Sequence, residues 1–200
     1  YVIVSEKGTV VVLDPTYTVE GLEPDLILST HSHPDHVDRI LMKKDCKIVE
    51  GKMESGTVDD VKFTGIASTH RGDTIDEASL SNVLFLVEVD GLRIVHMGDI
   101  GQTKLTDAQI QALGKVDIAF MQFVNSYSNY GIDGATGISV IEQLKPSVII
   151  PTHSIPKVNT TLGETVGALE NVSDELVISA DDLKDAGRKV IVIKNSLVEK

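Results

Sequence analysis

The stretch His-Ser-His-Pro-Asp-His at residues 31–36 is the most informative part of the sequence. It gathers three of the six histidines and one carboxylate directly after the apolar segment 26–29, which predicts a short buried strand. Residues two apart on an extended chain point the same way, so His31 and His33 can bind one ion together. Pro34 suits the first position of a helix, so Asp35 and His36 would lie in its first turn and face a second ion. Imidazole and carboxylate are ligands of zinc, manganese and iron(II), and the stretch therefore predicts a metal site.

Two other histidines follow predicted strands in the same way. The apolar segment 61–67 is followed by Ser68-Thr69-His70, and the segment 148–150 is followed by Pro151-Thr152-His153. Loops that are held by a rigid scaffold are where functional side chains tend to gather. We therefore expect His70 to complete a three-histidine set with the first two histidines of the motif.

A carboxylate also follows a predicted strand. Asp90-Gly91 is a strong two-residue hairpin signal, and it predicts a hairpin with strands at 81–89 and 92–97. Gly98-Asp99 comes directly after this hairpin. His96 shares a strand face with apolar residues of the same strand, so we predict that it is buried beside the site and is not a ligand.

These motifs resemble the signature of the metallo-β-lactamase superfamily over nearly the whole chain. The first motif carries most of the resemblance, and the segments His96-Met97-Gly98-Asp99 and Pro151-Thr152-His153 support it by their order and context. The resemblance implies a four-layer αββα sandwich, with two β-sheets face to face, helices on the outer faces and metals at one edge. We expect residues 1–200 to form a single domain of this kind. The spacing from the first motif to His70 is most similar to that of the ascorbate-6-phosphate lactonase-like branch.

The resemblance also implies two divalent metal ions, with zinc expected first and manganese or iron(II) as alternatives. In the superfamily, the position of Asp99 holds the carboxylate that bridges both ions. We expect Asp35 and Asp99 to be catalytic, with Asp35 orienting a hydroxide between the ions and moving its proton to the leaving group. The expected ligands are His31, His33 and His70 for one ion, Asp35, His36 and His153 for the other, and Asp99 between them.

The remaining sequence predicts further strands and helices. Val37, Ile40 and Leu41 repeat at helical spacing after the metal motif, and capping boxes at 106–109 and 161–164 predict two helix starts. The predicted strands are 2–4, 10–13, 47–49, 116–121, 177–178 and 190–193, and the other predicted helices are 134–144 and 161–169.

A polar loop at 122–133 follows one of these strands and is expected to line the substrate pocket. It holds Asn125, Tyr127 and Tyr130. Arg71 is next to His70, so we expect it to pair with a substrate anion, with Asp73 as the alternative partner.

The charge and the composition exclude several classes of partner. The net charge is −12 and the pI is about 4.8, so phosphate backbones should repel the chain, and nucleic acid is a poor candidate. No apolar run approaches the ~20 residues of a membrane span. Cys46 is the only cysteine, which excludes an intrachain disulfide and favours the cytoplasm. We expect a small-molecule substrate, and the sequence allows a homo-oligomer.

The resulting hypothesis is a binuclear metal-dependent hydrolase that acts on a small ester, lactone or phosphodiester. One alternative is a di-iron oxidoreductase of the same fold, although such members typically have a carboxylate where His33 stands. A second alternative is a metal-binding module without turnover, which the full ligand set disfavours.

Overall fold

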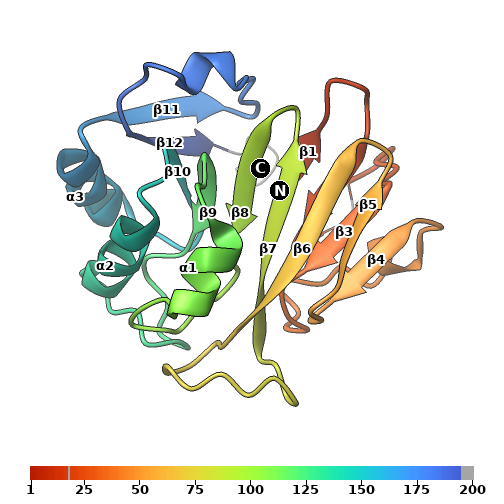
Figure 1. Ribbon diagram of the computed structural model, residues 1–200, viewed down its shortest axis with the longest axis horizontal. Coiled ribbons are helices and arrows are strands. Elements are labelled where there is room, and N and C mark those ends of the chain that lie inside the picture. Colours follow the sequence, from red (N-terminus) through yellow and green to blue (C-terminus); the bar gives the residue numbers. More distant parts are fainter. Residues whose placement is uncertain (18, 195–200) are drawn as a thin grey trace.

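A computed structural model describes residues 1–17 and 19–194. In it the chain folds into two β-sheets that pack face to face (Figure 1). The smaller sheet has the strand order β1-β2-β3-β4, in which β1 is antiparallel to β2 and the other three strands are parallel. Its strands are β1 (Val2–Val4), β2 (Val10–Leu13), β3 (Leu26–Ser29) and β4 (Lys47–Glu50).

The larger sheet has the order β11-β12-β10-β9-β8-β7-β6-β5. Neighbours from β5 to β8 are antiparallel, whereas β8, β9, β10, β12 and β11 run parallel. Its strands are β5 (Ser55–Val58), β6 (Val61–Ser68), β7 (Asn82–Val89), β8 (Leu92–His96), β9 (Ile118–Met121), β10 (Val148–Pro151), β11 (Leu169–Ser173) and β12 (Lys189–Lys194).

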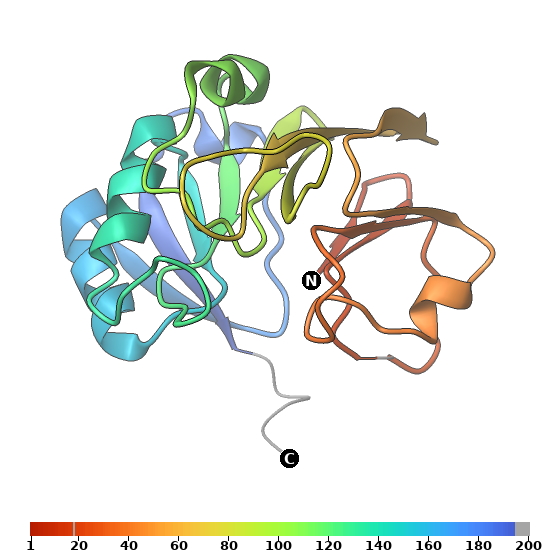
Figure 2. The same cartoon turned by 90° about the horizontal axis from the view of Figure 1, so that it is seen from below.

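Helices cover the outer face of the larger sheet (Figure 2). They are α1 (Asp107–Leu113), α2 (Ala135–Leu144) and α3 (Pro156–Val166). The outer face of the smaller sheet packs against the short 3-10 helix η1 (Leu41–Lys43), and a second 3-10 helix, η2 (Asp181–Leu183), precedes β12. The predicted two-sheet αββα fold is therefore confirmed, although the described residues over the smaller sheet hold one helical turn instead of a full helix.

The alternation of side chains along the strands explains this layering. Val11 and Leu13 of β2 point into the core between the two sheets, while Val12 points outward onto Leu41 of η1. Successive side chains of a strand point to opposite faces, so one strand contributes to two apolar layers. In β7, the side chains at 83, 85, 87 and 89 enter the core between the sheets, and those at 84 and 86 pack under the helices.

The helix that was predicted directly after the metal motif is wrong. Residues 34–36 form a turn that is closed by a 2.9 Å hydrogen bond from the His36 amide to the His33 carbonyl. The Asp38 carboxylate then accepts hydrogen bonds from the amides of Ile40, at 2.7 Å, and Leu41, at 3.1 Å. An aspartate that binds amides two and three residues ahead favours a turn over a continuous helix, and here it delays the first helical turn to η1.

Two other predictions near the carboxyl terminus are wrong. The helix predicted from 161 begins at Pro156, and Thr161 lies inside it, where its hydroxyl donates to the Lys157 carbonyl at 3.1 Å. Residues 177–178 are not a strand. The edge strands β5 and β11 were missed, because Ser-Gly-Thr-Val and Leu-Glu-Asn-Val-Ser face solvent and lack a clear apolar pattern.

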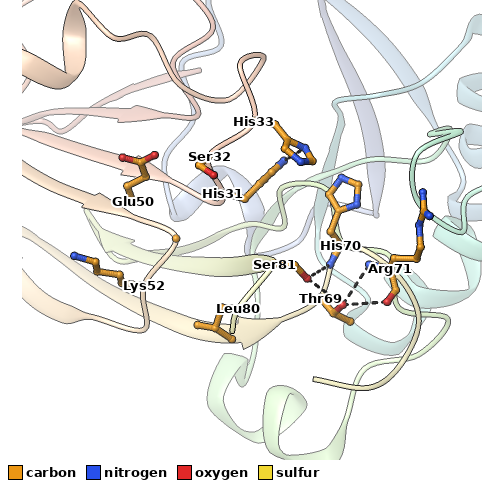
Figure 3. A pocket seen from close by; sticks show the side chains of 11 residues that line it. His31, Ser32, His33, Glu50, Lys52, Thr69, His70, Arg71, Leu80 and Ser81 are labelled. Carbon is orange, nitrogen blue, oxygen red and sulfur yellow. Dashed lines mark hydrogen bonds between the residues drawn. The ribbon is translucent and has the colours of Figure 1, made fainter. Parts of the chain in front are cut away.

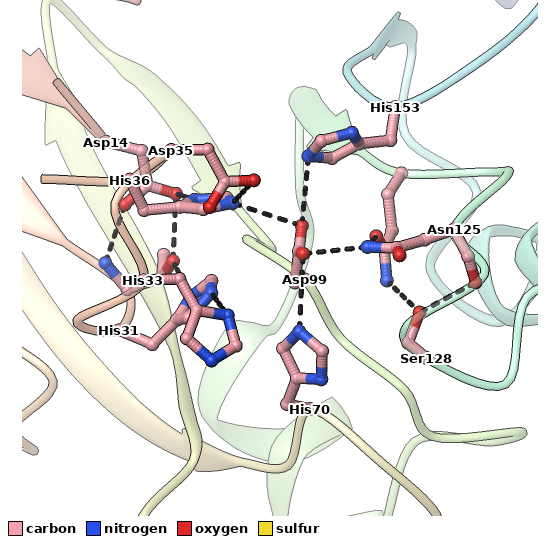
Figure 4. A network of polar contacts seen from close by, with 12 residues as sticks. Asp14, His31, His33, Asp35, His36, His70, Asp99, Asn125, Ser128 and His153 are labelled. Atoms are coloured by element: carbon pink, nitrogen blue, oxygen red, sulfur yellow. Dashed lines mark hydrogen bonds and ion pairs between the residues drawn. The ribbon is translucent and has the colours of Figure 1, made fainter. Parts of the chain in front are cut away.

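The ends of the strands position the predicted site. The motif loop follows β3, His70 follows β6, Asp99 follows β8 and His153 follows β10. These four strand ends lead into loops that meet at one edge of the two sheets (Figure 4). Within the described ranges, none of the helices has the length and apolarity needed to cross a membrane.

Candidate metal centre

Seven side chains from four loops converge at the edge of the sheets (Figure 4). Their ligand atoms form three overlapping groups, and within each group these atoms all lie within 4.8 Å of one another. The seven are the residues that the sequence predicted as ligands. The groups are His31 with His33 and His70, His31 with His36 and Asp99, and Asp35 with His36 and His153.

Asp99 joins the two halves of this cluster. Its Oδ2 lies 3.4 Å from Nε2 of His70. Its Oδ1 lies 3.4 Å from Nε2 of His36 and 3.3 Å from Nε2 of His153. One oxygen therefore faces the group of His70 and the other faces the second group, as a bridging carboxylate requires.

The hydrogen bonds behind His31 fix which of its nitrogens faces the site. The Thr30 hydroxyl donates its single proton to Asp14 at 2.8 Å, so its oxygen accepts from Nδ1 of His31, 3.0 Å away. Nε2 of His31 is then free of a proton and lies 3.1 Å from Nδ1 of His33. At this distance the pair is hydrogen-bonded, with the Nδ1–H of His33 as the donor, and a bound cation would take the place of that proton.

The separations between the candidate ligand atoms fit a metal. Zinc bonds of about 2.0–2.2 Å at tetrahedral angles hold neighbouring ligand atoms about 3.3–3.6 Å apart. The Asp99 contacts of 3.3–3.4 Å fall in this range, and Oδ2 of Asp35 lies 3.7 Å from Nε2 of His36. Nε2 of His36, Nε2 of His70 and Oδ1 of Asp99 are also buried without a hydrogen-bond partner among the described residues. Such atoms are costly in a protein interior unless a ligand satisfies them.

Comparison with known proteins identifies the family. A model described as the beta-lactamase superfamily domain matches residues 1–153. The chain belongs to the metallo-β-lactamase superfamily. A UPF0173 metal-dependent hydrolase of Thermoplasma acidophilum is 30% identical over 155 residues, which cover 67% of this chain and 67% of that protein. This likeness places the chain in the UPF0173 metal-dependent hydrolase family of the superfamily.

Solved structures agree on the fold. A metallo-β-lactamase superfamily protein from Thermotoga maritima has a TM-score of 0.69 and 22% identity, with 96% of this chain and 94% of that chain covered. CmlA, a diiron β-hydroxylase from Streptomyces venezuelae, has a TM-score of 0.50 and 14% identity, with coverage of 72% and 41%. At these identities the likeness concerns the fold alone. The narrower resemblance to the ascorbate-6-phosphate lactonase-like branch stays a prediction.

In this member of the metallo-β-lactamase superfamily, Asp14 supports the candidate ligand cluster from behind. It accepts hydrogen bonds from Nδ1 of His36 at 2.7 Å, from Nε2 of His96 at 2.6 Å and from the Thr30 amide at 2.7 Å. Asp14 was not predicted as a site residue, because the one local signal for it is its place before Pro15 at the end of a strand. His96 is 3% exposed and is not in any of the three ligand groups, so its predicted buried role is confirmed.

The candidate ligands differ in whether they already have the protonation state that metal binding requires. Burial and then the neighbouring His36 lower the pKa of His31 to about 4, so this imidazole is neutral near pH 7. Burial alone would lower the pKa of His36, but the carboxylates of Asp14 and Asp99 raise it to about 10. Burial alone would raise the pKa of Asp14, but contacts with His96 and His36 hold it well below its ordinary value. Without a metal, His36 therefore carries a proton that a metal must displace.

The four residues predicted for the substrate pocket take different positions. Asn125 is buried and donates a 2.7 Å hydrogen bond to Oδ2 of Asp99. Tyr130 is 2% exposed and its hydroxyl donates to the Gln102 carbonyl at 3.0 Å, so the structure assigns it to the core instead of the pocket. Tyr127 is 75% exposed, and its carbonyl accepts a 2.8 Å hydrogen bond from Nη2 of Arg71. Asp73, the alternative partner of Arg71, instead binds the Thr103 amide and hydroxyl at 2.6 Å each.

Proposed function

We propose that the chain is a binuclear metal-dependent hydrolase of small esters, lactones or phosphodiesters. His31, His33 and His70 would hold one ion, Asp35, His36 and His153 the other, and Asp99 would contact both. The observation that carries this proposal is the spacing around Asp99, whose two oxygens face different ligand groups at 3.3–3.4 Å. The hydrolase names of the UPF0173 relatives support it.

The set of donor atoms suits zinc best. Five imidazoles and two carboxylates face the site, and zinc binds nitrogen and oxygen donors of this kind at low coordination numbers. Manganese and iron(II) accept the same donors, with a stronger preference for oxygen in the case of manganese. Bound divalent ions supply polarisation of the substrate carbonyl or phosphoryl oxygen and an acidified water at neutral pH.

Residues of the chain would transfer the proton and orient the metal-binding histidines. Asp35 has a side chain that is 57% exposed, whereas that of Asp99 is 4% exposed. We assign proton transfer to the leaving group to Asp35, because its carboxylate is accessible to solvent and to a substrate. Asp14 would hold His36 through Nδ1, so that Nε2 faces the site. Thr30 does the same for His31.

Metal analysis combined with an activity panel tests the proposal. Protein purified without added metal would be analysed for zinc, manganese and iron, and then assayed on lactones, esters and phosphodiesters beside Asp99→Ala. About two colourless metal ions per chain and turnover that is lost in Asp99→Ala would support the hydrolase. Zinc without turnover of any of these substrate classes would contradict it in favour of a binding module, and coloured iron with oxygen consumption would favour the oxidoreductase.

A further inference from the structure

An open pocket of about 640 Å³ lies beside the first ligand group (Figure 3). His31, His33 and His70 line it together with Arg71 and Lys52. Of the described residues that line it, Glu50 is the only carboxylate, and its Oε1 lies 3.5 Å from Nη1 of Arg39. The lining therefore offers two cationic side chains beside the histidines in a protein whose net charge is −12.

The guanidinium of Arg71 has N–H groups at this pocket that the described residues do not use. Its side chain extends alongside His70 (Figure 3). Among the described residues its guanidinium has no carboxylate partner, and the hydrogen bond from Nη2 to the Tyr127 carbonyl uses one of its five N–H groups. The planar fork of an arginine matches the two oxygens of a carboxylate or a phosphate, so an unpaired arginine at a pocket favours such a group.

The main chain and the neighbouring loop hold Arg71 in place. The Thr69 hydroxyl accepts from the Arg71 amide at 3.2 Å and donates to the Arg71 carbonyl at 3.1 Å. The loop at 122–133 fixes the other end, because the Tyr127 amide donates to the Asn125 side chain at 2.9 Å and the Tyr127 carbonyl holds the guanidinium. The guanidinium is thus oriented before a substrate arrives, which reduces the entropy that binding must overcome.

We propose that Arg71 binds an anionic group, a carboxylate or a phosphate, on the substrate of this site. The proposal rests on the proposed function, because it places the anion beside the bond that the metal centre would cleave. Lys52 lies on the other side of the histidines from Arg71 (Figure 3), so it adds to the general attraction for anions without sharing this contact. The substrate class is then a small ester, lactone or phosphodiester that carries a second, uncleaved anionic group.

Binding of amides, checked by the absence of released 4-nitroaniline, tests this assignment separately from catalysis. The probes are N-(4-nitrophenyl)butyramide, which is neutral, its succinamic acid counterpart, which ends in a carboxylate, and the matching phosphonate. Calorimetry on zinc-loaded protein would give the Kd of each probe for the wild type, Arg71→Ala, Arg71→Lys and Lys52→Ala. Thermal unfolding of each variant checks that it is folded.

We expect one of the anionic amides to bind the wild type at least tenfold more tightly than the neutral amide, as a charge-assisted pair of hydrogen bonds supplies about that factor. This preference should vanish in Arg71→Ala and be partly kept in Arg71→Lys. The anionic amide that binds more tightly shows whether the site prefers a carboxylate or a phosphate-like group. Equal or undetectable binding of all three amides, a preference that survives Arg71→Ala, or an equal loss in Lys52→Ala would overturn the assignment. A protein that shows the preference but cleaves no ester, lactone or phosphodiester keeps this inference and loses the proposed function.

Discussion

The side-chain amide of Asn125 donates a 2.7 Å hydrogen bond to Oδ2 of Asp99. The same amide donates to Oε1 of Gln122 at 2.8 Å, and its oxygen accepts from the Tyr127 amide at 2.9 Å. All hydrogen-bonding groups of Asn125 are therefore engaged, and its orientation toward Asp99 is fixed. The bond leaves Oδ1 of Asp99 free to face His36 and His153.

Replacement of Asn125 by Ala should weaken metal binding. Loss of a hydrogen bond to a ligating carboxylate typically reduces metal affinity by about 10–100-fold. Titration of metal-free protein against a chromophoric zinc chelator measures this change. Asn129→Ala is the matched control, because Asn129 lies on the same loop and donates to the Gly101 carbonyl at 3.1 Å without touching the cluster. Equal affinities for the wild type and Asn125→Ala would contradict this role.

Zinc uptake at pH 8 should release about one proton from His36, because a ligating imidazole must be neutral. The carboxylates of Asp14 and Asp99 raise the pKa of His36 to about 10, so this histidine is protonated at pH 8 in the metal-free protein. Calorimetry in two buffers with different ionisation enthalpies counts the released protons.

Asp14→Asn provides the comparison for this count. Without the Asp14 charge the pKa of His36 should fall, so fewer protons should be released in the same buffers. Because folding raises the pKa of His36, protonation of His36 stabilises the metal-free fold. This stabilisation is fully present below pH 6.5 and is lost as the pH rises toward 10. Identical proton counts for both proteins would show that Asp14 does not control His36.

Gly98→Ala should destabilise the fold and disturb Asp99. The φ angle of Gly98 is +52°, and an added Cβ would lie 2.4 Å from Oγ1 of Thr30 and 2.6 Å from Oδ1 of Asn82. Overpacking of this kind costs about 1–3 kcal/mol. Urea unfolding measures the loss, and Gly187→Ala is the control, because a Cβ there meets no atom within 4 Å. Equal midpoints for the two variants would be inconsistent with the tight approach of the Asp99 loop to Thr30.

The sequence predicted most of the strands and the position of the site, for identifiable reasons. The apolar runs of β3, β7 and β8 are buried on both faces, so their pattern was clear, and Asp90-Gly91 forms the turn between β7 and β8. The capping box at Thr106 is present as predicted, with hydrogen bonds in both directions to Gln109. By contrast, β5 and β11 lie at the exposed edges of the larger sheet, where little burial selects for apolar residues.

Local sequence patterns could not predict the residues that hold the site together from distant parts of the chain. Asp14 is 22 residues before His36 and 82 before His96, and only the pairing of β2 with β3 brings it beneath the motif. Asn125 and Tyr130 lie on one polar loop and were predicted together, yet one reaches Asp99 and the other enters the core. Nothing in the composition of that loop separates the two orientations.

Anomalous diffraction from crystals of zinc-loaded protein tests the central claim most directly. We predict two zinc peaks on either side of Asp99, each about 2.0–2.3 Å from its ligand atoms. One peak should contact His31, His33 and His70, and the other should contact Asp35, His36 and His153. A single peak, or peaks away from Asp99, would contradict the binuclear centre.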